Sequence, residues 1–288
     1  MPQIRLVIFR LFVIIGEKED GCENVFLPEK IKYLIAEEDY AEDDIGMSAA
    51  SVLIYENKVL KIQEYNEEAE NECVMMQYLH DKLPVPTVYA HEIGDDKSYL
   101  LMSKCEGQMS CSPAYMSDPL LLCKLLADGL KRLWSVDAVD CPSNQCLSHK
   151  LMQAKYNIEN NLVDLDNVEP DTFGEGGFKN PAELFAWLCD NAPAEELALS
   201  HGDYCLPNIF GIRDEVSGFI DLGKTGVADK WCDIAICYRS LLHNYSGKYK
   251  QQGCHTDTDF DSLQLFHELG IEPDWRKIRY YILLDELF

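Results

Sequence analysis

The chain has 288 residues, 47% of them hydrophobic and 26% charged, so it can bury a sizeable core in one or two lobes. Its 50 acidic residues outnumber the 25 basic ones, which argues against nucleic-acid and anionic membrane partners and favours a cationic partner or plain solubility. Twelve scattered cysteines without a C-x-x-C pair indicate reduced, buried thiols in a cytoplasmic protein rather than disulfides or a zinc site.

The apolar N-terminal stretch Leu6 to Ile15 predicts no membrane anchor. It is broken by Arg10, and it runs into the charged segment Gly16 to Asp20 without a cleavage site of small residues. A run of this length is also too short to cross a bilayer. We therefore expect no membrane partner.

The next part of the chain predicts a short helix followed by a β-hairpin. The helix-like run from Pro28 to Leu34 precedes an acidic, solvated cluster and a group of small residues. Two β-prone runs, Ser51 to Tyr55 and Lys58 to Ile62, are joined by Glu56 and Asn57. That spacing suits a hairpin.

A lysine and a glutamate follow in an order typical of kinases. Lys61 lies at the end of the second β-prone run, and Glu72 follows in a stretch whose apolar residues have helical spacing. Kinases pair a strand lysine with a helix glutamate to orient the α- and β-phosphates. We expect the same pair here, with Glu70 as the competing partner.

Further segments predict the rest of the framework. The run Tyr99 to Gly107 is typical of a strand that passes into a linker between lobes. Asp118 to Trp134 places five leucines on one helical face, and Pro181 suits the first turn of a later helix. Tyr280 to Leu284 is too apolar for a loose tail, so we expect a docked C-terminal helix.

The most informative motif is H-G-D-x-x-x-x-N, from His201 to Asn208, followed by Asp221 in Asp-Leu-Gly. Phosphoryl transfer to a hydroxyl needs a carboxylate near the attacking oxygen and Mg²⁺ held by hard oxygen donors. Protein kinases supply these groups with H-R-D-x-x-x-x-N and D-F-G. The motif therefore predicts Asp203 as the catalytic carboxylate, with Asn208 and Asp221 as Mg²⁺ ligands.

The chain resembles the aminoglycoside 3'-phosphotransferase family from about Pro28 to its last residue. Three segments carry the resemblance: His201 to Asn208, Phe219 to Ala235, and Tyr280 to Phe288. It implies an α+β, bilobal protein-kinase-like fold. The small β-rich nucleotide lobe is expected at 28–105 and the larger, mostly helical catalytic and substrate-binding lobe at 106–288, with 1–27 as an N-terminal extension.

The resemblance also implies the nucleotide site. The expected cofactors are ATP, with GTP as an open alternative, and Mg²⁺. Lys61 and Glu72 would serve the phosphates, and Ser48 would lie in a loop that covers them. The linker that binds the base would contain Met102, Ser103 and Cys105.

For the acceptor, the resemblance implies a cationic aminoglycoside whose amines meet acidic groups. The expected substrate-binding residues are Glu169, Asp171, Lys224, Asp285, Glu286 and Phe288 with its terminal carboxylate. His201 is expected to hold the catalytic loop by hydrogen bonds, and Asp233 to support that loop together with Arg239.

Two alternatives stay open at this stage. The first is a kinase of the same fold that acts on choline or another amino alcohol, although the acidic terminus from Asp285 to Phe288 suits a multiply charged aminosugar better. The second is a nucleotide-binding pseudoenzyme, which the presence of Lys61, Asp203, Asn208 and Asp221 argues against.

Overall fold

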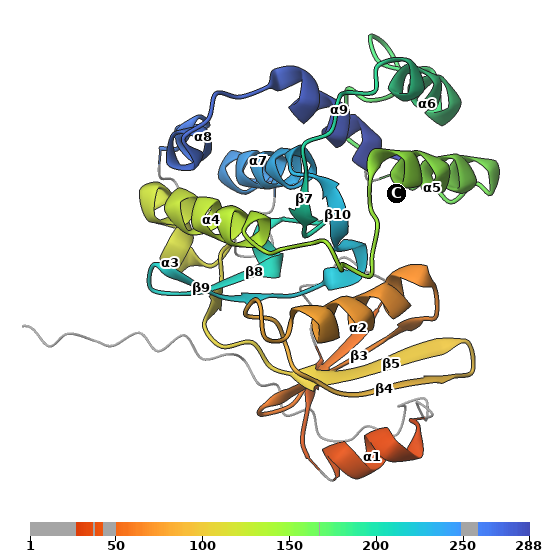
Figure 1. Cartoon of the computed structure of the whole chain (residues 1–288), viewed down its shortest axis with the longest axis vertical. Helices are drawn as coiled ribbons and strands as arrows, with labels where there is room; N and C mark the ends of the chain where they lie inside the picture. Colours follow the sequence, from red (N-terminus) through yellow and green to blue (C-terminus); the bar gives the residue numbers. More distant parts are fainter. Residues whose placement is uncertain (1–26, 37, 43–49, 167, 249–258) are drawn as a thin grey trace, which may run out of the picture.

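The computed structural model describes residues 27–36, 38–42, 50–166, 168–248 and 259–288. Figure 1 shows a small β-rich lobe below a larger lobe made mostly of helices, which confirms the expected α+β, bilobal fold. Ser48, expected over the phosphates, lies outside these ranges. Within them, every helix is too short or too polar to cross a bilayer.

The small lobe is built on one antiparallel sheet with the strand order β1-β2-β3-β5-β4. The hairpin expected from the sequence forms strands β2 and β3, in which Val52 pairs with Lys61. The strands are β1 (Ala41–Glu42), β2 (Ser51–Ile54), β3 (Lys58–Glu64), β4 (Val88–Gly94) and β5 (Lys97–Ser103).

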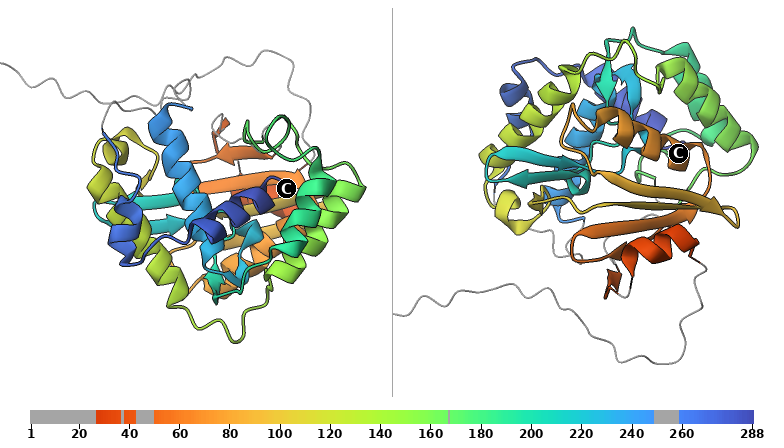
Figure 2. Two further views of the ribbon diagram at one scale, coloured as in Figure 1. Left: turned by 90° about the horizontal axis from the view of Figure 1, so that it is seen from above. Right: turned by 60° about the horizontal axis from the view of Figure 1, so that its bottom comes forward.

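Helices α1 (Glu29–Ile35) and α2 (Glu67–Leu79) cover opposite faces of this sheet (Figures 1 and 2). Side chains of a strand alternate between the two faces. Along β5, Tyr99 and Leu101 accordingly belong to the cluster with α1, and Leu100 and Met102 to the cluster that includes α2. The same alternation directs Lys61 away from the α1 side, toward the larger lobe.

The larger lobe surrounds two small antiparallel sheets, one of strands β7 and β10 and one of β6, β8 and β9. Its strands are β6 (Gln108–Met109), β7 (Leu197–Ser200), β8 (Ile209–Ile212), β9 (Glu215–Phe219) and β10 (Gly226–Asp229). Its described α-helices are α3 (Pro113–Met116), α4 (Pro119–Trp134), α5 (Leu147–Glu159), α6 (Pro181–Asp190), α7 (Trp231–Ser246), α8 (Gln264–Leu269) and α9 (Trp275–Asp285), and its 3₁₀ turns are η1 (Leu206–Asn208) and η2 (Leu222–Lys224).

Three helix predictions are confirmed. Helix α4 begins after Asp118, whose side chain accepts a hydrogen bond from the Leu121 amide at 3.1 Å, and α6 begins at Pro181. Helix α9 is docked by buried residues that include Tyr280, Tyr281 and Leu284. The C-terminal segment is therefore a fixed part of the larger lobe.

One hydrophobic core runs across the boundary between the lobes. Buried residues of α2, among them Met75 and Met76, belong to the same cluster as the core of the larger lobe. Of the ten described cysteines, all are free and five are buried, which fits the expected thiols. Cys189 is an exception because it is exposed.

Candidate active site

The catalytic loop between β7 and η1 is anchored by Asp233 of helix α7. The Asp233 carboxylate accepts hydrogen bonds from Ser200 Oγ and from the His201 and Gly202 amides, each at 2.9 Å. Complete burial raises the pKa of Asp233, although these donors oppose that rise. Gly202 has φ +85° and a Cβ there would lie 2.0 Å from the Lys224 carbonyl oxygen, so this turn requires glycine.

His201 is completely buried and holds the loop through several hydrogen bonds. Its Nδ1 accepts from the Asp203 amide at 3.4 Å, and its carbonyl oxygen accepts from Thr225 Oγ1 at 2.8 Å. Arg239 does not contribute to this support, contrary to expectation, because its guanidinium binds Asp285 and Glu286 instead.

Asp203 and Asn208 face each other across the loop. Asn208 Nδ2 donates to an Asp203 carboxylate oxygen at 3.0 Å and to the Asp203 carbonyl at 3.1 Å. The Ile220 amide donates to the Asn208 carbonyl at 3.1 Å, and this bond brings the end of β9 to the loop. Asp221 follows directly, in a left-handed conformation with φ 63°.

Lys61 joins the small lobe to this group. Its ammonium lies 2.9 Å from the Glu72 carboxylate and also binds Asp221, so Glu72 rather than Glu70 is the partner. Burial by itself would lower the pKa of Lys61, but the two carboxylates raise it above its usual range. The pKa of Glu72 is raised by complete burial, and that of Asp221 is lowered by Lys61 against the effect of its burial.

The linker residues are positioned at the end of β5. Met102 is buried in the core. The Ser103 amide donates to the Thr87 carbonyl at 2.9 Å, and the Lys104 amide to the Asn57 carbonyl at 3.1 Å. Among the described residues, no backbone carbonyl accepts from the amides of Cys105, Glu106 or Gly107.

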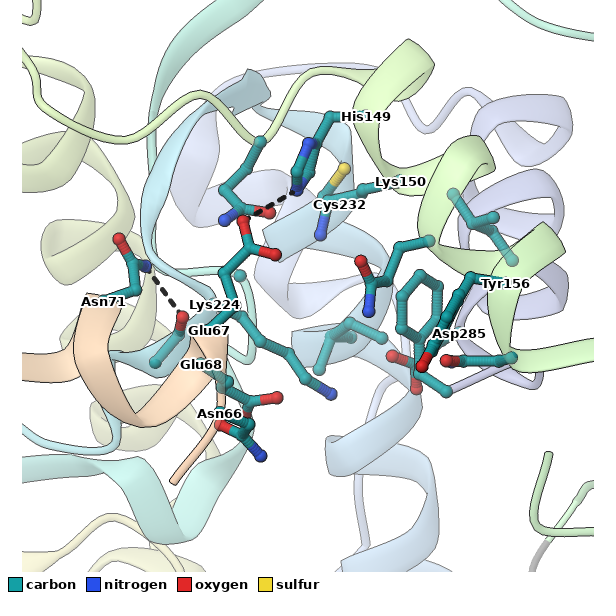
Figure 3. A pocket seen from close by; sticks show the side chains of 18 of the residues that line it. Asn66, Glu67, Glu68, Asn71, His149, Lys150, Tyr156, Lys224, Cys232 and Asp285 are labelled. Atoms are coloured by element: carbon teal, nitrogen blue, oxygen red, sulfur yellow. Dashed lines mark hydrogen bonds and ion pairs between the residues drawn. The ribbon is translucent and has the colours of Figure 1, made fainter. Parts of the chain in front are cut away.

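A cavity of about 420 Å³ opens beside the catalytic loop (Figure 3). Three of the expected substrate-binding residues line it: Lys224, Asp285 and Phe288. Lys224 projects into it between Glu68 of α2 and Asp285 of α9. Burial would lower the pKa of Lys224, but Asp285 and Glu68 raise it.

The other three expected acceptor residues do not line the cavity. The Glu286 side chain is only 3% exposed, and its carboxylate binds Arg239 at 3.3 Å and accepts from the Glu169 amide at 2.7 Å. The Glu169 carboxylate lies 2.9 Å from His243 Nε2 and 3.2 Å from Lys248 Nζ. Asp171 is exposed outside the cavity. Internal cations thus already satisfy two of these three acids.

The cavity also has walls that the motifs did not indicate. Glu67 and Glu68 line it from α2, and α5 contributes a polar stripe of His149, Gln153 and Asn157. These three residues are spaced four apart, so a helical-face pattern was available in the sequence as a signal. Asn157 Nδ2 also donates to the Leu287 carbonyl at 2.9 Å, which ties the C-terminal tail to α5.

The donor set at Asn208 and Asp221 fits a metal that arrives with a nucleotide. Among the described residues, no group of three His, Cys, Asp or Glu side chains could hold a metal ion alone. Mg²⁺ is usually bound through one or two carboxylates together with substrate phosphates and water. One carboxylate and one amide oxygen beside Lys61 match that requirement.

Comparison with known proteins places this chain in a family. A model of the phosphotransferase enzyme family matches residues 45–279. The chain is 40% identical to an aminoglycoside 3'-phosphotransferase of Enterococcus faecalis, over 90% of this chain and 97% of that protein. The chain belongs to the aminoglycoside 3'-phosphotransferase family. A second member, from Staphylococcus aureus, is 39% identical over 90% of this chain and 97% of its own length.

Solved structures agree with this family at the level of the fold. A crystal structure of an aminoglycoside-3'-phosphotransferase of type VIII matches with a TM-score of 0.71 at 24% identity, covering 87% of this chain and 94% of the other. An aminoglycoside phosphotransferase from Streptomyces rimosus, in complex with ADP and streptomycin, matches with a TM-score of 0.69 at 23% identity, covering 90% and 97%. The bilobal arrangement is thus shared with solved kinases of this group.

Proposed function

We propose that this enzyme transfers the γ-phosphate of ATP to the 3'-hydroxyl of a cationic aminoglycoside in the cytoplasm, and so confers antibiotic resistance. The observation that carries the proposal is the position of the Asp203 loop, with the Lys61–Asp221 pair on one side and the cavity on the other. Family membership supports the reaction class.

The residues of the chain supply positioning and charge. In a loose phosphoryl-transfer transition state the nucleophile needs little deprotonation, so Asp203 orients the acceptor hydroxyl and accepts its proton late. Asn208 holds the Asp203 carboxylate in place. Lys61, fixed by Glu72, binds the α- and β-phosphates, and the Cys105 amide and Ser103 carbonyl meet the base. Mg²⁺ bound at Asn208 and Asp221 would offset charge on the phosphates.

The acceptor would lie in the cavity. Glu67, Glu68 and Asp285 line it together with the last residue, Phe288, and with the cations Lys224 and Lys150, and Asp285 is shared with Arg239. Several carboxylates around a partly enclosed cleft attract a polycation more strongly than one exposed pair, which contributes only ~0–1 kcal/mol. A cavity of about 420 Å³ is also large for a single amino alcohol.

A coupled assay of ADP release from ATP and Mg²⁺ tests the proposal, with kanamycin, neomycin, gentamicin and choline as acceptors. We expect release with kanamycin and neomycin and none above background with choline. Release with choline alone would instead identify an amino-alcohol kinase. Tight nucleotide binding without release for any acceptor would identify a nucleotide-binding pseudoenzyme.

A further inference from the structure

Asn71 of helix α2 forms a bridge between the lobes. Its side-chain Nδ2 donates to the carbonyl oxygen of Gly223 at 2.7 Å and to that of Thr225 at 2.9 Å. Both acceptors belong to the segment that follows Asp221. The next residue in the helix, Glu72, binds Lys61. A single amide group therefore joins the helix that carries Glu72 to the turn that carries Asp221.

The chemistry of this bridge requires a donor, and asparagine provides it. Two carbonyl oxygens can only accept, and the other polar side chains of residues 67–72 are all glutamates, which accept when ionised. Asparagine is also a weak helix former in a helix interior. The two hydrogen bonds to the other lobe compensate for that weakness.

The contact between α2 and the turn is close at this point. A Cβ on Gly223 would lie 2.5 Å from Cγ of Glu68, so the helix packs directly on the turn. The bridge also continues to the catalytic loop, because Thr225 Oγ1 donates to the His201 carbonyl at 2.8 Å. A shift of α2 would therefore move both the Asp221 turn and the loop of Asp203.

We propose that Asn71 is a positioning residue that sets Asp221 relative to the Lys61–Glu72 pair. The inference rests on the proposed role of Asp221 as a metal ligand. Without the bridge, the turn would no longer be held in a fixed position relative to α2. Asp221 would then be placed less well for a metal bound with the nucleotide. Metal-dependent nucleotide binding and turnover would suffer. Asn71 also lines the cavity, but its amide hydrogens are taken by the Gly223 and Thr225 carbonyls, so we expect a smaller effect on binding of the acceptor.

The test compares Asn71→Leu and Asn71→Ser with a matched control, Asn157→Leu. Asn157 also donates from Nδ2 to a backbone carbonyl at the same cavity, that of Leu287. Calorimetry measures ADP affinity with and without Mg²⁺, and steady-state kinetics measure kcat and the KM for kanamycin. Thermal melting of each apo variant establishes that it is folded.

For the Asn71 variants we expect unchanged ADP affinity without Mg²⁺. The increase in ADP affinity on adding Mg²⁺, called the Mg²⁺ gain below, should be about tenfold smaller than in wild type. We also expect about a tenfold lower kcat, consistent with two lost hydrogen bonds. The KM for kanamycin should stay within twofold. Asn157→Leu should show the reverse, with a raised KM and a normal Mg²⁺ gain. If Asn71→Leu does not fold, Asn71→Ser decides the outcome.

A normal Mg²⁺ gain in a folded Asn71 variant would overturn the inference. Asp221→Asn separates this failure from a failure of the proposed function. If Asp221→Asn loses the Mg²⁺ gain while the Asn71 variants keep it, only the bridge is refuted. If Asp221→Asn also keeps the gain, the metal site itself has been assigned to the wrong residues.

Discussion

The two sides of the site distribute charge in opposite ways. On the nucleotide side one cation, Lys61, serves two acids, Glu72 and Asp221. On the acceptor side the acids already have internal cations: Arg239 binds Asp285 and Glu286, while Lys248 binds Glu169, whose carboxylate also contacts the His243 imidazole. The proposed function would require Lys61 and Asp221 to exchange these contacts for phosphate and metal.

The acceptor side has fewer free acids than its sequence suggests. The Glu286 carboxylate accepts from the Glu169 amide and so holds the tail to the preceding loop, and neither residue lines the cavity. The acidic residues that line the cavity are Glu67 and Glu68 of α2 and Asp285, which Arg239 also binds, and the last residue, Phe288, lies beside them. The following predictions test this contrast, from the largest expected effect to the smallest.

Removing the catalytic carboxylate should have the largest effect. Asp203→Ala and Asp203→Asn should lower kcat by about 10³-fold or more while ADP affinity stays within a few-fold, since the proposed role of Asp203 is to orient the acceptor hydroxyl. Single-turnover kinetics and calorimetry measure the two quantities. Asp190→Asn, an exposed position at the end of α6, is the control. Near-normal turnover of either Asp203 variant would refute its role.

Changes to the proposed metal ligands should have the next largest effect. Asn208→Ala and Asp221→Ala should raise the Mg²⁺ concentration for half-maximal activity by about 10- to 100-fold, because each removes a hard oxygen donor. Titrations of activity against Mg²⁺ at saturating ATP measure this. Curves that match wild type for both variants would place the ligands elsewhere.

Changes to the tail should affect only the acceptor side. Deleting Phe288, or extending the chain beyond it, moves or removes the terminal carboxylate at the cavity. We expect about a tenfold higher KM for aminoglycosides, a larger effect for substrates with more amines, and a smaller effect as salt screens the attraction. Nucleotide affinity should not change. An unchanged KM for kanamycin and neomycin at low salt would exclude the tail from the substrate site.

Neutralising Glu169 should matter little to binding of the antibiotic. Because His243 and Lys248 already satisfy its carboxylate, Glu169→Gln should change the KM for kanamycin by less than about threefold. The kinetics of this variant are best measured beside the tail deletion under the same conditions. A loss as large as that of the tail deletion would mean that Glu169 meets the substrate directly.

The ion pair between Lys277 of helix α9 and Glu196 predicts a small, pH-dependent effect on the free energy of unfolding. Hydrogen bonds from Lys230, Trp231 and Lys277 lower the pKa of Glu196 from 4.5 to about 2. A depressed pKa contributes stability above pH 4.5 that is lost as the pH falls toward 2. Glu196→Gln should therefore cost ~0.5–1 kcal/mol at pH 7, a modest value because this side chain is 52% exposed.

Denaturant melts of wild type and Glu196→Gln at pH 7, 5 and 3 measure this difference. The difference in free energy of unfolding between the two proteins should be smaller at pH 3 than at pH 7. A gap that is constant across this range would show that the charge of Glu196 does not stabilise the fold.

The contrast between the two sides also explains what could be predicted from the sequence. Asp203, Asn208 and Asp221 lie in two short motifs with fixed spacing, and the local backbone brings them together. The Lys61–Glu72 pair follows from a strand and the next helix. Residues that are close together in the sequence therefore form most of the phosphoryl-transfer side of the site.

The acceptor side depends on pairs that are distant in sequence. Nothing near Glu169 in the chain indicates that His243 and Lys248 lie beside it, and the Arg239–Glu286 pair likewise requires helix α7 to pack against the tail. The sequence alone therefore predicts Arg239 beside Asp233 and does not reveal its ion pair with Glu286. Asn71 was missed because its two partners belong to the other lobe.

The most direct test of the proposed reaction compares kanamycin with its 3'-deoxy analogue under identical conditions, with purified full-length chain, ATP and Mg²⁺. Product is followed by ³¹P NMR with proton correlation. We predict one phosphorylated kanamycin, with phosphorus coupled to the proton at carbon 3', and no product from the analogue. Phosphorylation of the 3'-deoxy analogue at a comparable rate, or phosphorus at another carbon of kanamycin, would contradict the assigned reaction.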